Sequence, residues 1–421
     1  MNTAAVGTTQ RPSRPVATIL AASTLGLALF AGSTPAAAEA APHDPWVYSW
    51  GPNGAGQLGN GTTTERLNPG PVLNLARADV KSIAAGGLDA NTAFAVTLLK
   101  NGTVKSWGKN AYGQLGNGTT NDQTVPASVV GLTGVEAVAA GRHHALALKD
   151  GRVLAWGRND VGQLGNGNFG TGTPEVTAKS PVDVQSLENV TAIAAGAEYS
   201  LALRADGTVW AWGSNVWGTL GNGKSGKDTP AAPNHNTPQQ VPGLTGITDI
   251  AAGAWHALAL TKDHTVKAWG YNSSGQIGND AFSSTVPVST PTDVKDFGRA
   301  VALAAGGHHT LALLDNGTVK AWGANASEQL GERQDQPPAP TFRTTPVLVK
   351  GLTSVKELAA GYATSLAVLE DGSVVAWGSN SNGQLGDGTK TNSRTPVMVL
   401  PPGSGINHLA AARDAYSVYA Y

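Results

Sequence analysis

The chain has 421 residues, with 28 basic and 29 acidic side chains and a formal net charge of -1. This balance argues against a protein that binds nucleic acid or an anionic membrane surface, since such proteins carry a basic footprint. There are 54 glycines and no cysteine, which excludes disulfides and thiolate chemistry, and 41% hydrophobic residues suffice for a large buried core.

The N-terminal segment has the pattern of an export signal. Arg11 and Arg14 precede an apolar run over residues 16–31, and small residues follow up to Ala40. No Arg-Arg pair precedes the run, which favours a Sec-type route. An uncleaved membrane anchor is the alternative, but the run is shorter than a bilayer-spanning helix needs. We therefore expect residues 1–40 to be a signal peptide and the protein to be secreted.

One stretch, residues 104–119 (VKSWGKNAYGQLGNGT), recurs along nearly the whole of the remaining chain. Its Trp-Gly pair is found at Trp50, Trp107, Trp156, Trp212, Trp269, Trp322 and Trp377, at spacings of 49 to 57 residues. A period of this size indicates a ring or an array of supersecondary units. Residues 41–421 are therefore expected to consist of seven repeats.

Each repeat predicts four short strands, as residues 135–182 illustrate. The first segment ends in Ala-Ala-Gly, and small residues at this place in successive repeats predict strands that crowd together near an axis. The second and third segments are separated by Asp150-Gly151, a hairpin signal. A loop follows the tryptophan, and Pro181 then marks a fourth, edge strand. Four antiparallel strands in each of seven units predict an all-β fold, a seven-bladed β-propeller.

The two ends of the repeat region complement each other. Residues 406–412 and 416–421 supply the first two strands of a unit, and residues 46–50 and 71–73 supply the last two. We therefore expect the N- and C-termini to share one closing blade. The alternative is an open solenoid, which would leave strand edges unpaired.

The Trp-Gly-x-Asn-x-x-Gly-Gln-Leu-Gly run, the Ala-Ala-Gly-x-x-His segment and the Asp-Gly turn together resemble the repeat of the regulator of chromosome condensation family. The resemblance covers essentially everything after the signal, and it implies a seven-bladed propeller with a shared closing blade. Functions within that family differ: one member is a nucleotide exchange factor, a plant relative senses ultraviolet light through clustered tryptophans, and an exported bacterial relative inhibits β-lactamase. The shared fold does not indicate which of these functions the chain has.

The export signal and the lack of a basic tail argue against a nuclear exchange factor. The four tryptophans outside the Trp-Gly positions are expected in different repeats, which argues against a light-sensing cluster. We therefore interpret the chain as an exported bacterial member of the family: a secreted, monomeric, non-enzymatic scaffold that binds a protein or a cell-wall-associated partner. Three alternatives remain open: an enzyme inhibitor like the propeller β-lactamase inhibitor, an exchange-type regulator by family resemblance, and a propeller lyase or hydrolase with a site at the channel mouth.

The binding residues are expected on one face, where the loops between strands one and two and between strands three and four emerge. The tips of these loops vary among repeats while the frame stays constant, as in a binding scaffold. The tips that carry residue types common in interface hot spots are Trp217, Trp255, Tyr112, Tyr362 and Arg142. The plainer alternative is that each packs on its own blade. Longer inserts at residues 166–179, 222–236 and 331–344 could cover this face or form another site.

The sequence contains none of the short motifs that mark hydrolase or metal centres, so neither catalytic residues nor a cofactor is expected. The pairs His143-His144 and His308-His309 are not expected to bind metal, because adjacent strand residues point to opposite faces. We expect His144, His256 and His309 to bond to the neighbouring strand instead.

Overall fold

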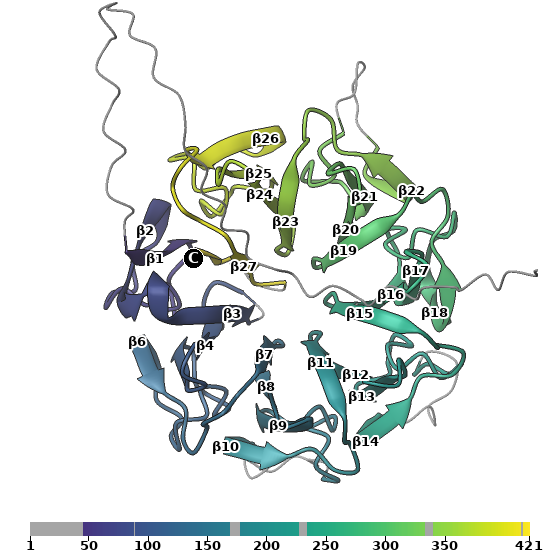
Figure 1. Cartoon of the computed structure of the whole chain (residues 1–421), viewed down its shortest axis with the longest axis horizontal. Coiled ribbons are helices and arrows are strands. Elements are labelled where there is room, and N and C mark those ends of the chain that lie inside the picture. The colour runs from purple at the N-terminus through teal and green to yellow at the C-terminus, as the bar shows by residue number, and fades with distance from the viewer. Residues whose placement is uncertain (1–44, 88, 169–176, 227–233, 333–339, 414–415) are drawn as a thin grey trace, which may run out of the picture. The chain divides into compact units, whose positions relative to one another are not determined.

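The computed structural model describes residues 45–87, 89–168, 177–226, 234–332, 340–413 and 416–421. Residues 42–421 cluster as one unit, and within the described part 28 strands form seven four-stranded antiparallel sheets arranged around an axis (Figure 1). The seven-bladed propeller predicted from the repeats is therefore confirmed. The predicted signal peptide lies outside the described residues and stays a prediction.

Six blades are formed by consecutive strands. The first three are β3 (Val80–Gly86), β4 (Phe94–Leu99), β5 (Val104–Gly108) and β6 (Gln123–Ser128); β7 (Ala137–Ala140), β8 (His144–Lys149), β9 (Arg152–Gly157) and β10 (Ala178–Asp183); and β11 (Val190–Ala195), β12 (Tyr199–Arg204), β13 (Val209–Gly213) and β14 (His235–Gln240). The next three are β15 (Ile247–Ala252), β16 (His256–Thr261), β17 (Val266–Asn272) and β18 (Ser283–Asp293); β19 (Ala300–Ala305), β20 (His309–Leu314), β21 (Val319–Ala324) and β22 (Phe342–Leu348); and β23 (Val355–Ala360), β24 (Thr364–Leu369), β25 (Val374–Gly378) and β26 (Ser393–Leu400).

The seventh, closing blade joins the two ends of the propeller. Its order is β2 (Arg66–Ala76), β1 (Trp46–Gly51), β28 (Val418–Ala420) and β27 (Leu409–Ala411), and a short 3-10 helix, η1 (Arg77–Asp79), follows β2. Strands β1 and β28 pair antiparallel, with Ser49 opposite Tyr419. The predicted closing blade is confirmed, and the open solenoid is excluded.

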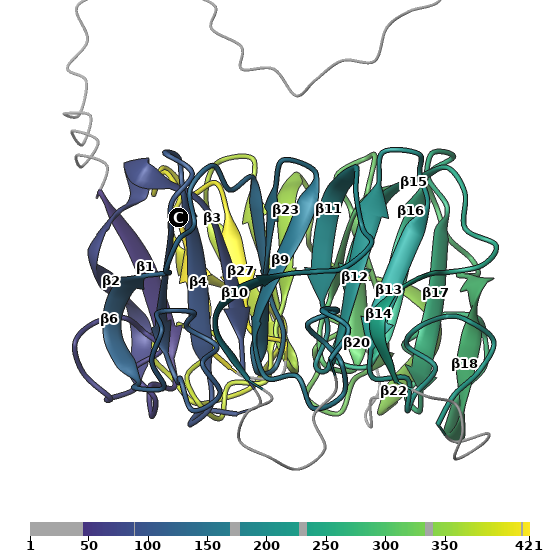
Figure 2. The same cartoon turned by 90° about the horizontal axis from the view of Figure 1, so that it is seen from below.

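The hairpin turns owe their shape to Asx residues. In four blades an Asn or Asp side chain accepts a hydrogen bond from the backbone N–H two residues later, as Asp206 does from Thr208 at 3.0 Å. In the β8–β9 turn both Asp150 and Gly151 have positive φ, at 50° and 69°, as a type I′ turn requires. Because the turns alternate with the longer loops along each antiparallel sheet, the propeller has a turn face and a loop face, and Figure 2 shows the connections gathered at these two ends.

The seven repeated tryptophans form the core between blades. Each is fully buried, and each indole Nε1 donates a hydrogen bond of 2.7–3.0 Å to a carbonyl of the preceding blade's loop, as Trp156 does to Gln114. The loop glycine that follows is needed for this contact. A Cβ at Gly116, where φ is +63°, would lie 2.8 Å from Trp156 Nε1. The repeated motif therefore encodes blade-to-blade packing.

Buried histidines also join neighbouring blades. The imidazole Nε2 of His144 lies 3.0 Å from Ser200 Oγ, and that hydroxyl donates to the carbonyl of Gln163. His256 and His309 make the equivalent bonds to Thr310 and Ser365 in the blades that follow them. The predicted structural role of these three histidines is confirmed.

Candidate loop-face binding site

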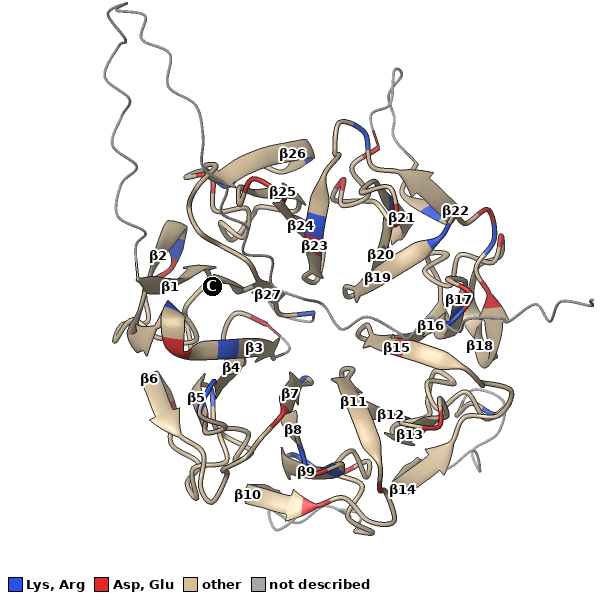
Figure 3. Cartoon of the chain, in the orientation of Figure 1, with Lys and Arg blue, Asp and Glu red and all other residues tan. Residues whose placement is uncertain are grey.

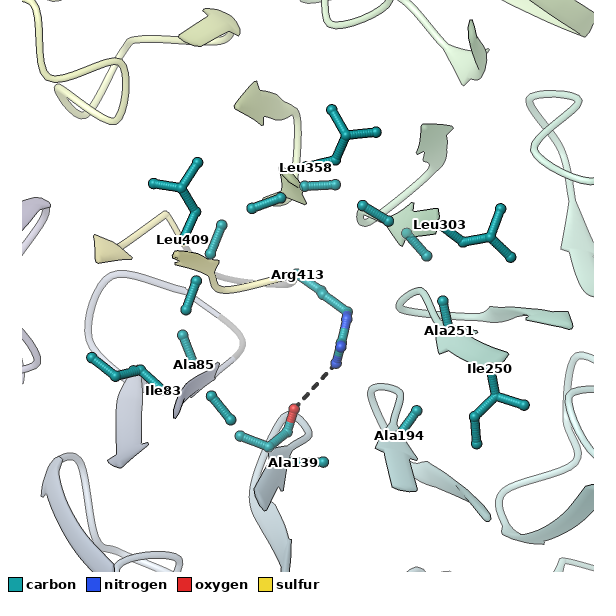
Figure 4. Close-up of a pocket in the computed structure, with 18 of the residues that line it drawn as sticks. Ile83, Ala85, Ala139, Ala194, Ile250, Ala251, Leu303, Leu358, Leu409 and Arg413 are labelled. Atoms are coloured by element: carbon teal, nitrogen blue, oxygen red, sulfur yellow. Dashed lines mark hydrogen bonds between the residues drawn. The ribbon is translucent and has the colours of Figure 1, made fainter. Parts of the chain in front are cut away.

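The loop face opens onto a central cavity of about 350 Å³. The alanine-rich ends of the first strands from all seven blades line it, which confirms that small residues crowd around the axis (Figure 4). Arg413, just after β27, extends its guanidinium across the cavity and donates to the carbonyls of Ala195 at 2.5 Å and Ala140 at 3.4 Å. Arg413 of the closing blade thus donates hydrogen bonds to backbone carbonyls at the ends of the first strands of two other blades.

Backbone hydrogen bonds between blades fix the loops that surround this opening. The loop between the first and second strands of one blade bonds to the equivalent loop of the next, as in Arg142 N to Ala197 O (3.0 Å) and Ala197 N to Ala254 O (3.0 Å). The same pattern continues from Ala254 to Gly306 and from Gly307 to Tyr362. Side chains at these tips are therefore held by a rigid base, which favours precise binding.

Arg142 is at the centre of one group of side chains. Its guanidinium lies 4.9 Å from the ring centroid of Trp255, and its Nη1 is 3.6 Å from Glu198 Oε1. The three residues come from three consecutive blades. Burial raises the pKa of Glu198, and the nearby Arg142 and Arg158 oppose that shift. A cation–π contact and an ion pair thus connect three loop tips.

Tyr112 belongs to a second group on the same face. Its ring packs against that of His143 with the centroids 4.9 Å apart and the planes tilted by 45°, and the guanidinium of Arg158 lies 5.1 Å from the Tyr112 centroid. Arg158 in turn pairs with Asp160 at 2.5 Å. Burial, followed by the charges of Arg158 and Arg142, lowers the pKa of His143 to about 4. His143 is therefore neutral at physiological pH.

Trp217 and Tyr362 belong to a chain of aromatic contacts that runs over five blades. Trp217 packs on Tyr271 at 4.3 Å, Tyr271 meets the edge of His308 at 5.9 Å, and His308 meets Tyr362 at 5.8 Å. Tyr362 continues to Tyr416 of the closing blade at 5.6 Å. Burial and the charge of Arg142 lower the pKa of His308, so the Arg142 group is electrostatically coupled to this chain.

The structure brings all five predicted residues to the loop face. Each is partly exposed, and each contacts a side chain of another blade. Whether they bind a partner stays a prediction. We call the combined surface the aromatic rim, which consists of Tyr112, Arg142, His143, Arg158, Trp217, Trp255, Tyr271, His308, Tyr362 and Tyr416.

Sequence reasoning did not name the other five members of the rim as binding residues, which are His143, His308, Tyr416, Arg158 and Tyr271. The last two, Arg158 and Tyr271, share one place in the repeat. Both occupy the variable position between Gly and Asn in the Trp-Gly-x-Asn motif, so variation at that position was the available signal. One further expectation was wrong: Trp210 and Trp217 share the β11–β14 blade and do not fall in different repeats. The predicted inserts each include positions outside the described residues.

Two further observations concern the described residues only. No helix among them has the length and apolarity needed to cross a membrane. In the same ranges, no three His, Cys, Asp or Glu side chains converge in a way that could hold a metal ion.

The comparisons with known proteins agree with this architecture. The chain is 32% identical over 294 residues to the ultraviolet-B receptor UVR8 of Arabidopsis thaliana, covering 68% of this chain and 62% of the receptor's length. It is 29% identical over 380 residues to the secretion-regulating guanine nucleotide exchange factor of Mus musculus, covering 85% of this chain and 79% of that protein. The chain therefore spans less than two thirds of the plant receptor.

A solved structure and a family model match most of the chain. The crystal structure of Prp20p from Saccharomyces cerevisiae shares the fold with a TM-score of 0.76 at 24% identity, covering 89% of this chain and 91% of that one. The family model of the RCC1-like domain matches residues 46–418, which is every blade described above. The chain therefore belongs to the RCC1-like domain family.

Proposed function

We propose that this propeller is an exported, monomeric, non-enzymatic scaffold that binds a protein partner through the aromatic rim. The observation that carries the proposal is that loop tips from separate blades converge on one partly exposed surface of tryptophan, tyrosine and arginine. These residue types supply most of the binding energy in protein interfaces. The rigid backbone beneath them lowers the entropy lost on binding.

Related proteins and the N-terminal sequence support two parts of this proposal. The relatives include an ultraviolet-B receptor and a secretion-regulating guanine nucleotide exchange factor, and neither name describes an enzyme with a catalytic site of its own. Export is supported by the basic, apolar and small-residue pattern of residues 1–40. The near-neutral net charge gives no support for a nucleic-acid partner.

The test begins with capture of partners from the producing organism's culture supernatant on immobilised propeller, followed by mass spectrometry. The affinity of the identified protein is then measured for wild type and for Trp217→Ala/Trp255→Ala. We expect a loss of at least about tenfold, because interface tryptophans are common hot spots. Trp210→Ala is the matched control, since Trp210 lies on β13 of the same blade as Trp217 and outside the rim. Equal affinities for the double variant and the control would overturn the proposal.

A narrower form of the proposal is that the partner is an enzyme and that the propeller inhibits it. The resemblance to an exported β-lactamase inhibitor makes β-lactamases the first class to examine. Purified propeller at micromolar concentration is expected to slow hydrolysis by at least one member of a β-lactamase panel. Unchanged hydrolysis throughout the panel would end this narrower form and leave the scaffold proposal to the capture experiment.

A further inference from the structure

A second pocket, of about 720 Å³, lies on the turn face, opposite the aromatic rim. It is found where β27 of the closing blade lies beside β3 and β23 of the neighbouring blades. Its lining comes from hairpin turns, the starts of strands and the segments that connect blades. Nothing in the proposed function accounts for this pocket.

Four basic side chains from four separate elements line the pocket. Arg77 comes from η1, Lys81 from β3, Lys100 from the turn after β4, and Lys356 from β23. In Figure 3, β3 and β23 on either side of β27 both carry basic segments. The chain as a whole has 28 basic and 29 acidic residues, so this local excess is not a consequence of composition.

The nearby carboxylate, Glu357, bonds to other groups and not to these four cations. Glu357 accepts hydrogen bonds from His408 Nδ1 at 2.8 Å and from the backbone N–H of Leu409 at 2.9 Å. Arg77 donates to the carbonyl of Ser404 at 3.0 Å, and Lys356 Nζ donates to Asn407 Oδ1 at 2.7 Å. Among the described residues, none of the four cations forms an ion pair. The described residues that line the pocket therefore include four basic side chains and no acidic one.

Tyr421 and His408 form part of the wall of the pocket. The ring of Tyr421 is buried and stacks on His408 with centroids 5.3 Å apart and an interplanar angle of 33°. Its Oη accepts a hydrogen bond of 3.1 Å from the backbone N–H of Ile83 in β3. A pocket of this volume is the size that small-molecule ligands occupy.

We propose that this pocket, the basic pocket, binds a small polyanion that carries two or more phosphate, sulfate or carboxylate groups. Lysine ammonium groups act as mobile point charges toward such oxyanions, and the arginine adds directed donors. The ligand would contact segments from both ends of the propeller, at Arg77 and at His408. Because it would bind the closed ring and not the unfolded chain, it would raise the melting temperature.

The experiment uses the full chain at fixed ionic strength in chloride buffer, with pyrophosphate and citrate as probes. Calorimetric titration and thermal unfolding are measured for wild type, Lys81→Gln/Lys356→Gln and the charge-matched control Lys295→Gln/Lys350→Gln. Both control lysines are exposed and lie outside the pocket. We expect saturable binding to wild type, a loss of at least tenfold in the pocket variant, and less than twofold change in the control.

Each outcome decides the proposal. Tighter binding of pyrophosphate than citrate would support a phosphorylated ligand, and the reverse order a carboxylated one. If neither pyrophosphate nor citrate binds saturably at millimolar concentration, the proposal is overturned. An equal loss of affinity for the probe in the two double variants would also overturn the proposal, because it would show that the probe responds to the overall charge of the protein and not to the pocket. The melting temperature without probe shows whether the pocket variant folds, and we expect no decrease, since the two replaced lysines are exposed.

Discussion

A single position shows why the Ala-Ala-Gly-x-x-His motif has its residues at this spacing. The ring of His256 packs over Gly253, so that a Cβ built on that glycine would lie 2.2 Å from Cε1 of the imidazole. Tyr199 lies over Gly196 in the same way, and Phe94 over Gly86. The glycine therefore provides space for an aromatic side chain that reaches toward the next blade.

The first prediction compares two of these glycines. Gly253→Ala is expected to destabilise the propeller by about 2 kcal/mol or more, because the buried ring cannot move without disturbing its neighbours. Gly361→Ala is the control: its blade has Thr364 in place of the histidine, and the added Cβ would meet nothing closer than 3.6 Å. Gly361→Ala is expected to be neutral or slightly stabilising. Urea unfolding measures both, and equal losses of stability would contradict the packing explanation.

The second prediction concerns pH. Burial lowers the pKa of His144, His256 and His309 to about 3, whereas an unfolded histidine titrates near 6.5. Above pH 6.5 both states are neutral and these histidines give no pH dependence. Below pH 6.5 the unfolded chain binds protons that the folded chain does not, so stability falls by about 1.4 kcal/mol per pH unit for each histidine.

His256→Phe tests this linkage at one site. Phe94 fills the equivalent position in the β3–β6 blade, so a phenyl ring is compatible with the fold there. The variant is expected to lose stability at pH 7, because it lacks the bond to Thr310, and to show a slope between pH 6 and pH 4 that is smaller by about one proton. The free energy of unfolding, measured for both proteins at several pH values across this range, checks the predicted slope. An unchanged slope would show that His256 is not neutral in the folded state.

Within each blade, the loop between the third and fourth strands is organised by one buried asparagine. In the β3–β6 blade, Asn110 Oδ1 accepts from Leu115 N at 2.9 Å, and its Nδ2 donates to the carbonyls of Thr119 at 3.1 Å and Asn121 at 3.0 Å. The asparagine amide supplies both a donor and an acceptor, which a carboxylate cannot. This loop also carries Tyr112 of the aromatic rim.

The third prediction removes this amide. Asn110→Ala is expected to cost about 2–4 kcal/mol, because several buried backbone groups lose their partner. Hydrogen exchange should quicken at Leu115 and at residues 117–121. Asn121→Ala is the control in the same loop, because the Asn121 side chain is exposed and the bonds of this residue described for the loop use its backbone N–H and carbonyl. If amide hydrogen exchange at these residues is the same in the two variants, the Asn110 side chain does not stabilise the loop.

For the propeller as a whole, stability depends on the closing blade. Strand β28 connects β27 to β1, and Tyr419 on β28 donates to the carbonyl of Gln57 and meets the edge of Trp107 at 5.8 Å. Without β28, strands β1 and β27 of the closing blade would both have unpaired edges. In repeat structures, interfaces between neighbours supply much of the stability, so opening the ring is costly.

The fourth prediction deletes residues 416–421. The deletion is expected to lower the melting temperature by more than about 10 °C, and unfolding should lose its single cooperative transition as terminal blades fray. Deletion of residues 1–40 is the control, since every contact described for the propeller begins at residue 45 or later. Scanning calorimetry distinguishes the two. If the chain without β28 keeps the melting temperature and the single cooperative transition of the full chain, the shared blade is not needed for the stability of the propeller.

The number of blades, the order of strands and the shared closing blade could all be predicted from the repeats. These features follow from local patterns, such as Trp156-Gly157, Asp150-Gly151 and the Ala-Ala-Gly segments, repeated at a nearly constant period. The sequence also placed Trp217, Trp255, Tyr112, Tyr362 and Arg142 on one face, because antiparallel strands alternate their connections between two ends.

The contacts between side chains of different blades could not be predicted from the repeats. Arg142 reaches Trp255 and Arg413 reaches Ala195 because closing the ring brings loops from distant repeats to one axis. The basic pocket likewise joins Arg77 to His408, which are far apart in sequence. Such contacts depend on the curvature and closure of the ring. The local sequence of one repeat does not predict the distance between residues in different blades.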